Sequence, residues 1–162
     1  MKINGRASPN HNARPAGTII DTIVLHADAS PTVAASLSWI LSSTSRVSYH
    51  YLIGRLGDVY ECVAPQRRAW HAGVSAFEGR PNCNDYSIGV SFGNLCNNHE
   101  PYRPDQLEAG VALCVDLIRR WPAITVERIT THSAVALPLG RKRDPGELFP
   151  LPEFLAEVRS RL

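Results

Sequence analysis

Three side chains of types that ligate metals, His26, His132 and Asp144, are spread across the sequence. His26 ends the apolar, β-branched segment TIIDTIVLH (18–26), and His132 ends the shorter segment RITTH (128–132). Both segments have the composition of strands, and strand ends present side chains to a cleft. Asp144 follows after enough residues for a loop to leave the second strand and return. Two imidazoles and a carboxylate suit one catalytic zinc ion that keeps a fourth position for water.

Each predicted ligand also has a simpler interpretation. A histidine at a strand end can be a hydrogen-bonded core residue, and Asp144 can form a salt bridge with Arg141 or Arg143 that is worth little when exposed. Asp28 is a rival third ligand, because it lies two residues beyond His26 and on the same side if the strand continues. The proline after Asp144 favours extended backbone there, which would hold the carboxylate in one direction.

The loop GRKRDPG (140–146) contains an exception to the cation usage of the chain. Of seventeen lysine and arginine residues, only Lys2 and Lys142 are lysines, and Lys142 stands between two arginines. An arginine presents a planar fork of donors, whereas a lysine ammonium is a compact charge that approaches a single oxygen. Lys142 is therefore a candidate for chemistry beside the predicted ligands, and chance is the alternative.

The composition predicts one globular domain. The chain has 162 residues, 44% of them hydrophobic, which is enough for one core and too little for two. The formal net charge of +2 is too small to indicate nucleic-acid binding. No apolar stretch reaches about eighteen residues, so no membrane span is predicted. The polar start MKINGRASPNHNARPAG lacks the apolar core of a secretory signal, so we expect synthesis in the cytoplasm.

The cysteine pattern points to free thiols. Four cysteines occur and none forms a C-x-x-C pair. In a protein made in the cytoplasm, free thiols are the default. A bridge between Cys83 and Cys96 across the intervening strand is the alternative.

Strand-like and helix-like segments alternate along the chain, which predicts an α/β domain. Predicted strands lie at 18–26, 47–54, 58–63, 86–92 and 128–132. Predicted helices lie at 30–41, with Ser30 as N-cap, at 104–121 and at 151–161. Residues 1–17 are expected to form an N-terminal extension packed on or near the domain 18–162. The loop 64–85 is long enough to suggest a function.

Several segments, in this order, resemble one enzyme family. They are TIVLHADAS, SYHYLIGRLGDVYECV, AWHAGVSAFEGRPNCNDYSIGVSF, YRPDQ, ITTHSAV and GRKRDPG. Together they resemble the zinc-dependent N-acetylmuramoyl-L-alanine amidases, which share a fold with the peptidoglycan recognition proteins. The resemblance covers about residues 18 to 160. It implies a central mixed β-sheet flanked by helices, with one zinc ion in a groove for the glycan-linked stem peptide of bacterial peptidoglycan.

The resemblance assigns the metal ligands residue by residue. His26 and His132 match the two histidine ligands of the family. Asp144 takes the place where the family uses either cysteine or aspartate. Since no cysteine follows Cys114, the chain offers no thiolate in that loop.

The resemblance also implies roles for residues around the metal. Lys142 matches a lysine two positions before the third ligand, and Tyr49 matches the tyrosine of the strand motif YH. The implied reaction is hydrolysis of the amide between N-acetylmuramic acid and L-alanine, with zinc and the Lys142 ammonium stabilising charge on the carbonyl oxygen. Tyr49 is a candidate hydrogen-bond donor, and its alternative is a strand residue with a wet hydroxyl. Trp70 and His71, in the motif AWHAG, are expected to line the substrate groove, with a structural hydrogen bond as the alternative for His71.

One departure from the recycling enzymes of the family concerns the general base. Those enzymes often carry a glutamate in the motif SIGIE, whereas this chain reads SIGVSF with Ser91 at that position. A serine cannot take up a proton as a carboxylate does near neutral pH. The phage and recognition proteins of the family also lack the glutamate. Tyr49, the attacking water itself or, more weakly, Glu61 are the candidates for the base, and His50 is expected on the opposite strand face, in the core.

Three functions are consistent with these features. The main prediction is a monomeric phage-type endolysin, which reaches and degrades the bacterial cell wall after lysis or release through a holin. The first alternative is a cytoplasmic recycling amidase that acts on soluble anhydro-muropeptides. The second is a peptidoglycan-binding module without catalysis, against which the complete ligand set argues.

Overall fold

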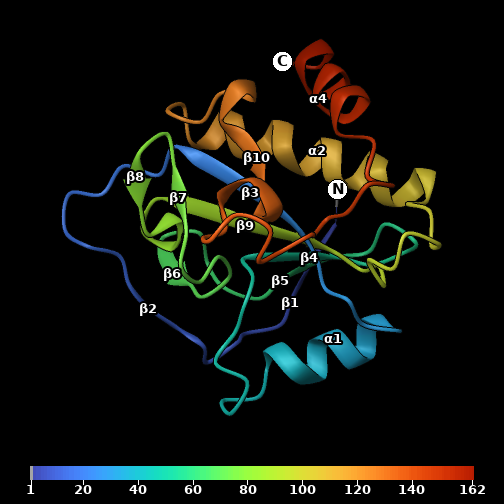
Figure 1. Ribbon diagram of the computed structural model, residues 1–162, viewed down its shortest axis with the longest axis horizontal. Helices are drawn as coiled ribbons and strands as arrows, with labels where there is room; N and C mark the ends of the chain where they lie inside the picture. Colours follow the sequence, from blue (N-terminus) through green and yellow to red (C-terminus); the bar gives the residue numbers. More distant parts are fainter. Residues whose placement is uncertain (1) are drawn as a thin grey trace.

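A six-stranded mixed β-sheet organises residues 2–162, which the computed structural model describes (Figure 1). In sheet order its strands are β1 (Ile3–Gly5), β5 (Val59–Glu61), β4 (Tyr51–Ile53), β9 (Ser87–Phe92), β3 (Thr22–Ala27) and β10 (Ile129–Thr131). The pair β4–β5 is antiparallel, and the other four pairs of this sheet are parallel. The predicted α/β class with a central mixed sheet flanked by helices is confirmed.

The two longest strands, β3 and β9, form the centre of the sheet. Every residue of both strands is buried, as expected for parallel strands that are covered on both faces. Their register pairs His26 with Ser91, so the last residues of the two strands lie side by side. β10 runs parallel to β3 on its other side, with Thr131 opposite Leu25. The carboxyl ends of three neighbouring strands therefore meet at one edge, where the predicted site residues lie.

Helices cover both faces of the sheet (Figure 1). They are α1 (Val33–Ile40), α2 (Pro104–Arg120), the short α3 (His132–Val135) and α4 (Leu151–Ser160). On one face α2 and α4 bury Leu113 and Phe154 against Phe92 in the main hydrophobic cluster. On the opposite face Ile40 of α1 packs with Leu52 in a smaller cluster. Successive strand residues point to opposite faces of the sheet, so side chains of β4 contribute to both clusters.

The predicted helices at 104–121 and 151–161 are confirmed to within one residue, but Ser30 is not the N-cap of the first helix. Thr32 caps α1, and its Oγ1 accepts the backbone N–H of Ala35 at 3.1 Å. The backbone N–H of Ser30 instead donates to Asp28 Oδ1 at 3.1 Å. The prediction was wrong because the turn that follows β3 uses Ser30 before the helix begins.

The N-terminal residues contribute strands of their own. β1 pairs with β5 at the edge of the main sheet, and β2 (His11–Ala13) pairs antiparallel with β6 (Arg67–Ala69). The long segment 64–85 contains β6, the small hairpin of β7 (Ala76–Phe77) and β8 (Arg80–Pro81), and the 3-10 turn η1 (Cys83–Asp85). A second 3-10 turn, η2 (Val126–Arg128), precedes β10.

Two expected absences can be compared with residues 2–162. All four cysteines are free thiols, so the alternative bridge between Cys83 and Cys96 is not formed. Within this part of the chain, none of the helices combines the length and the apolar character needed to cross a bilayer.

Candidate metal centre

Three neighbouring elements bring the predicted ligands together. His26 lies near the end of β3, His132 is the first residue of α3 directly after β10, and Asp144 lies in the loop before α4. Their ligand atoms all lie within 4.8 Å of one another. Asp144 Oδ2 is 3.2 Å from His26 Nδ1 and 3.0 Å from His132 Nδ1. The sequence prediction that these three distant residues meet is confirmed; their role as ligands stays a prediction.

Local contacts explain why the chain turns at His132 and returns at Asp144. Thr131 Oγ1 accepts the N–H of Ala134 at 3.3 Å, which starts α3 at the end of the strand. The N–H of Ser133 donates to the carbonyl of Asp144 at 2.9 Å and holds the returning loop against α3. A helix cap and a backbone hydrogen bond therefore position the cluster, in addition to the contacts between its side chains.

The hydrogen bonds of His132 determine which of its nitrogens is free. Its Nε2 lies 3.1 Å from the carbonyl oxygen of Ala72, which can only accept, so Nε2 carries the proton. Nδ1 therefore directs a lone pair at the Asp144 carboxylate, 3.0 Å away. Two acceptors at this separation repel one another unless a cation or a proton lies between them. The donor chemistry of the cluster therefore fits a metal ion.

The charge states of the cluster also fit. Burial lowers the pKa of His26 to about 4, so its imidazole is neutral near pH 7. Burial acts to raise the pKa of the Asp144 carboxyl, but contact with His132 and His26 in their protonated, donating forms outweighs burial and holds the pKa below its ordinary value. Neutral imidazole and ionised carboxylate are the forms that bind metals.

A pocket of about 330 Å³ opens beside the cluster and is lined by Tyr49, Trp70, His71 and Lys142 as well as by His132 and Asp144. The ring of Tyr49 lies 5.1 Å from that of His26, centre to centre. Burial and the carboxylates of Asp144 and Asp28 raise the pKa of Tyr49, so its hydroxyl stays protonated near neutral pH. Such a group donates a hydrogen bond and does not serve as a base.

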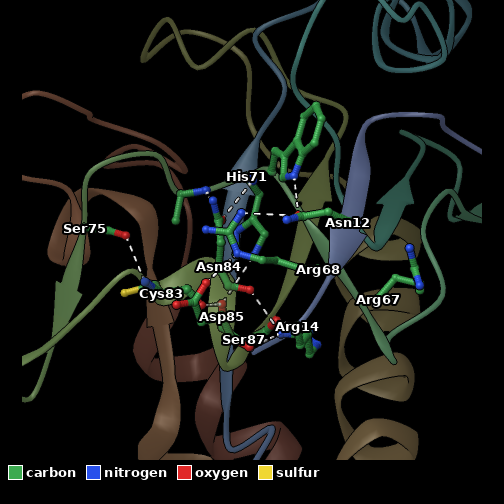
Figure 2. Close-up of polar contacts among 12 residues, drawn as sticks. Asn12, Arg14, Arg67, Arg68, His71, Ser75, Cys83, Asn84, Asp85 and Ser87 are labelled. Atoms are coloured by element: carbon green, nitrogen blue, oxygen red, sulfur yellow. Dashed lines mark hydrogen bonds and ion pairs between the residues drawn. The ribbon is translucent and has the colours of Figure 1, made fainter. Parts of the chain in front are cut away.

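Trp70 and His71 occupy different depths of this pocket. Trp70 is half-buried, and its Nε1–H donates to Asn12 Oδ1 of β2 at 2.8 Å, which holds the ring at the rim. His71 is buried, and its Nδ1 lies 3.0 Å from His26 Nε2. Asn84 Oδ1 accepts the backbone N–H of His71 at 3.1 Å (Figure 2). His71 therefore contacts the predicted metal ligand His26 through Nε2, the ring nitrogen that does not face Asp144.

Other candidates lie outside the cluster. Asp28 accepts hydrogen bonds from the N–H groups of Ser30 and Asn94, both at 3.1 Å, and from the hydroxyl of Ser36. It lines the pocket but is not part of the ligand cluster, so it is an anchor for the turn after β3. Glu61 accepts a hydrogen bond from the Tyr51 hydroxyl at 2.9 Å and does not line the pocket.

The sequence analysis missed several residues that line the pocket. Leu95 and Cys96 come from the loop after β9, and Arg143 stands next to Lys142. Cys96, Lys142 and Arg143 also line a neighbouring pocket of about 620 Å³, so the cleft continues past the metal cluster. The signal that could have found the first two is their position just beyond the carboxyl end of a central strand.

Comparisons with known proteins agree with this site. A sequence profile of the family described as N-acetylmuramoyl-L-alanine amidase matches residues 16–147. The 1,6-anhydro-N-acetylmuramyl-L-alanine amidase AmpD of Enterobacter cloacae is 36% identical over 166 residues, covering 92% of this chain and 86% of that protein. Other AmpD alignments, at 38% to 41% identity, span 57% to 60% of those proteins.

Solved structures show the same fold. The crystal structure of a selenomethionine derivative of AmpD superposes with a TM-score of 0.79 at 31% identity, over 96% of this chain and 94% of that one. The amidase AmiD of Escherichia coli, solved with anhydro-N-acetylmuramic acid-L-Ala-D-gamma-Glu-L-Lys, superposes with a TM-score of 0.76 at 29% identity, over 89% of this chain and 60% of that one. The chain belongs to the N-acetylmuramoyl-L-alanine amidase family and is an enzyme of that class.

Proposed function

We propose that this chain is a zinc-dependent amidase that removes the stem peptide from soluble anhydro-muropeptides. The observation that carries the proposal is the convergence of His26, His132 and Asp144, with a lone pair of His132 directed at the carboxylate. The substrate class is supported by the relatives that align over most of the chain, which are named for anhydro-muramyl substrates. These relatives favour the recycling alternative over the endolysin that was the main prediction from sequence.

Zinc is the metal that the donor set fits best. Two imidazole nitrogens and one carboxylate oxygen are three protein ligands, the number found in catalytic zinc sites with an open fourth position. When bound there, zinc supplies Lewis acidity, which polarises a carbonyl and lowers the pKa of water toward about 7. His26 and Asp144 contribute one neutral and one negative ligand, which leaves net positive charge for this purpose.

The remaining steps fall to residues of the pocket. In the reaction water adds to the lactyl carbonyl, the C–N bond breaks, and the nitrogen of L-alanine leaves with a proton. The Lys142 ammonium lies on the pocket wall two residues from Asp144 and stabilises the negative charge that develops on the carbonyl oxygen. Tyr49, which keeps its proton, donates a hydrogen bond to the same group or to the attacking water.

Substrate binding uses the walls of the cleft. Trp70 offers an apolar surface for sugar or peptide at the rim, and His71 contributes to the floor. Lys142 and Arg143 are both exposed where the two pockets join, so they present positive charge to the carboxylates of a stem peptide. We propose a monomer, because one chain supplies all three ligands of the cluster.

The test compares a fragment with the polymer. The purified protein is incubated with an anhydro-N-acetylmuramyl tripeptide and, separately, with purified sacculi, before chelation, after chelation and after zinc is restored. Peptide release is measured by mass spectrometry and loss of sacculi by turbidity. We expect zinc-dependent release from the fragment and no clearing of sacculi. Preferential clearing of sacculi would favour the endolysin, and binding without release by the zinc-loaded protein would favour the non-catalytic module.

A further inference from the structure

Behind His26 a row of polar groups leads away from the metal cluster to a backbone carbonyl. His26 Nε2 lies 3.0 Å from His71 Nδ1, and His71 Nε2 lies 3.3 Å from Ser87 Oγ. Ser87 Oγ lies 2.5 Å from the carbonyl oxygen of Cys83. Figure 2 shows His71, Ser87 and Cys83 in one buried network. Because all four residues are almost fully buried, these groups depend on one another for hydrogen bonds.

The Cys83 carbonyl at the end of this row determines which group donates in each of its hydrogen bonds. The Cys83 oxygen can only accept, so the single hydroxyl proton of Ser87 points at it. Ser87 Oγ is then an acceptor for His71, whose proton must sit on Nε2. His71 Nδ1 is left with a lone pair and accepts from His26, whose proton must sit on Nε2. Each step follows from the one before, and one arrangement of protons satisfies the whole row.

The consequence reaches the metal site. With its proton on Nε2, His26 directs the lone pair of Nδ1 at Asp144 Oδ2, as His132 does because of the Ala72 carbonyl. We propose that His71 is a positioning residue that sets the metal-binding tautomer of His26, with its own tautomer set by Ser87 and the Cys83 carbonyl. This inference rests on the proposed metal site, but it concerns protons that can be observed without metal or substrate.

The fold provides a fitted place for the His71 ring. A Cβ atom at Gly89 would lie 2.5 Å from His71 Cγ and 2.8 Å from its Nδ1, so the ring packs flat against the bare backbone of β9. The N–H groups of His71 and Ala72 both donate to Asn84 Oδ1, at 3.1 Å and 2.8 Å. The same clamp therefore positions His71 behind His26 and the Ala72 carbonyl behind His132. One short segment sets both imidazoles.

Without His71 the proton of His26 has a competing position. Nε2 would face no acceptor, and the Asp144 carboxylate, 3.2 Å from Nδ1, would draw the proton into the metal cluster. A metal ion would then have to displace this proton before binding. The function of His71 is thus to keep the proton on the far side of the ring, as outer partners of histidine ligands do in other metal sites.

The main variants are chosen to separate this role from packing. His71→Leu removes the acceptor and keeps an apolar side chain, whereas His71→Asn keeps an acceptor oxygen near the position of Nδ1. Zinc affinity is measured by competition with a chelator. We expect His71→Leu to bind zinc about 10- to 100-fold more weakly than the unmodified chain and His71→Asn to recover most of the loss. Equal affinity of the unmodified chain and His71→Leu would overturn the proposal.

The spectroscopic readout uses the metal-free protein. Long-range ¹H–¹⁵N spectra distinguish the two neutral tautomers of an imidazole. We expect the His26 proton on Nε2 in the unmodified chain and a shift toward Nδ1 in His71→Leu. A His26 proton on Nδ1 in the unmodified chain, or on Nε2 in a folded His71→Leu protein, would contradict the inference. Failure of the unmodified chain to bind zinc would instead contradict the proposed function.

A second pair of variants covers the case that His71→Leu does not fold. Ser87→Ala removes the acceptor that orders His71, and we expect zinc binding up to about tenfold weaker with a mixed His26 tautomer. Ser8→Ala is the matched control, because Ser8 is also buried and its hydroxyl also donates to a backbone carbonyl, that of Ile40 at 2.5 Å, but it does not line the pocket. Equal zinc affinity and equal spectra for the two serine variants would overturn the proposed order of hydrogen bonds.

Discussion

Two completely buried histidines, His26 and His50, serve different purposes in this protein. Burial lowers the pKa of both, to about 4 for His26 and about 3 for His50, so both are neutral near pH 7. His50 Nδ1 accepts the N–H of Gly89 at 2.9 Å, and its Nε2 donates to the carbonyl of Arg67 at 3.0 Å. His26 has one nitrogen against His71 and the other against a carboxylate. Burial and pKa alone therefore do not separate the two.

Backbone groups satisfy the hydrogen bonds of both ring nitrogens of His50. Arg14 Nη2 lies 3.1 Å from His50 Nε2, but its two protons have better partners in the carbonyls of Pro65, at 2.9 Å, and Ser87, at 2.8 Å. No lone pair of His50 is left to face a cation. His26 differs because its Nδ1 faces Asp144, a carboxylate that lines an open pocket. A histidine whose two ring nitrogens both hydrogen-bond to backbone groups is structural, whereas one that directs a ring nitrogen at a carboxylate in a pocket wall is available for a metal.

The largest expected effect comes from changing the carboxylate that His26 faces. Asp144→Asn removes the negative ligand, and we expect loss of bound zinc and amide hydrolysis at least about a thousandfold slower, since the metal supplies several kcal/mol of stabilisation. Metal content and peptide release measure this change. Asp28→Asn is the matched control, because Asp28 anchors a turn and should leave zinc bound. If instead Asp28→Asn lost the metal and Asp144→Asn kept it, the third ligand would be Asp28.

A smaller effect tests the pocket wall without touching the ligands. Lys142→Ala removes the ammonium proposed to stabilise the oxyanion, and we expect kcat about a hundredfold lower with zinc content unchanged. Lys2→Ala, at the only other lysine, should have normal kinetics. Normal kcat in zinc-loaded Lys142→Ala would remove this residue from the chemistry while leaving the metal site intact.

A change at His50 should affect the stability of the protein instead of its metal binding. His50→Ala leaves the Gly89 N–H and the Arg67 carbonyl without partners, and we expect the free energy of unfolding to fall by about 1–3 kcal/mol with unchanged zinc affinity. Denaturant unfolding and chelator competition measure the two quantities. Weakened zinc binding in folded His50→Ala would show that the two histidines are coupled.

The same variant has a predicted pH signature. The pKa of His50 is about 3 in the folded protein and 6.5 for an ordinary histidine, so between these values the unfolded chain binds more protons. Its contribution to stability is therefore full above about pH 6.5 and is lost as the pH falls toward about 3. Between these two pH values, the free energy of unfolding should change less with pH for His50→Ala than for the unmodified chain. An equal slope for the two proteins would contradict the assignment.

The smallest effect concerns the loop after β9 that lines the pocket. Glu100 pairs with Arg55 Nε at 2.5 Å and accepts the N–H of Leu95 at 2.6 Å, with about a quarter of its side chain exposed. The hydrogen bond from Arg55 lowers the pKa of Glu100, so its contribution is present above the ordinary value of 4.5 and is lost as the pH falls below it. Glu100→Gln should reduce stability by no more than about 1 kcal/mol, and by less at high salt. A larger loss would mean that this loop is part of the core that holds the site.

Much of the fold could be predicted because its signals are local. The continuous apolar runs of β3 and β9 and the apolar stripe of α2 depend on neighbouring residues, and all three were confirmed. The start of α1 was missed because Ser30 and Thr32 are both good caps, and the choice depends on Asp28, which uses the Ser30 N–H. Competing short-range signals of this kind are resolved by contacts outside the helix.

The ligand types, the pairing of lysine with aspartate in one loop and the α/β order were determined by the sequence itself, since residue identity and spacing carry them. Residue spacing left Asp28 open as a third ligand, and the tertiary structure placed Asp144 in the cluster instead. Only the tertiary structure showed that His71 contacts His26. The reason is physical. Whether a nitrogen offers a lone pair depends on where its proton sits, and the carbonyls of Cys83 and Ala72, which lie 57 and 60 positions from the histidines whose protons they fix, decide that only after folding.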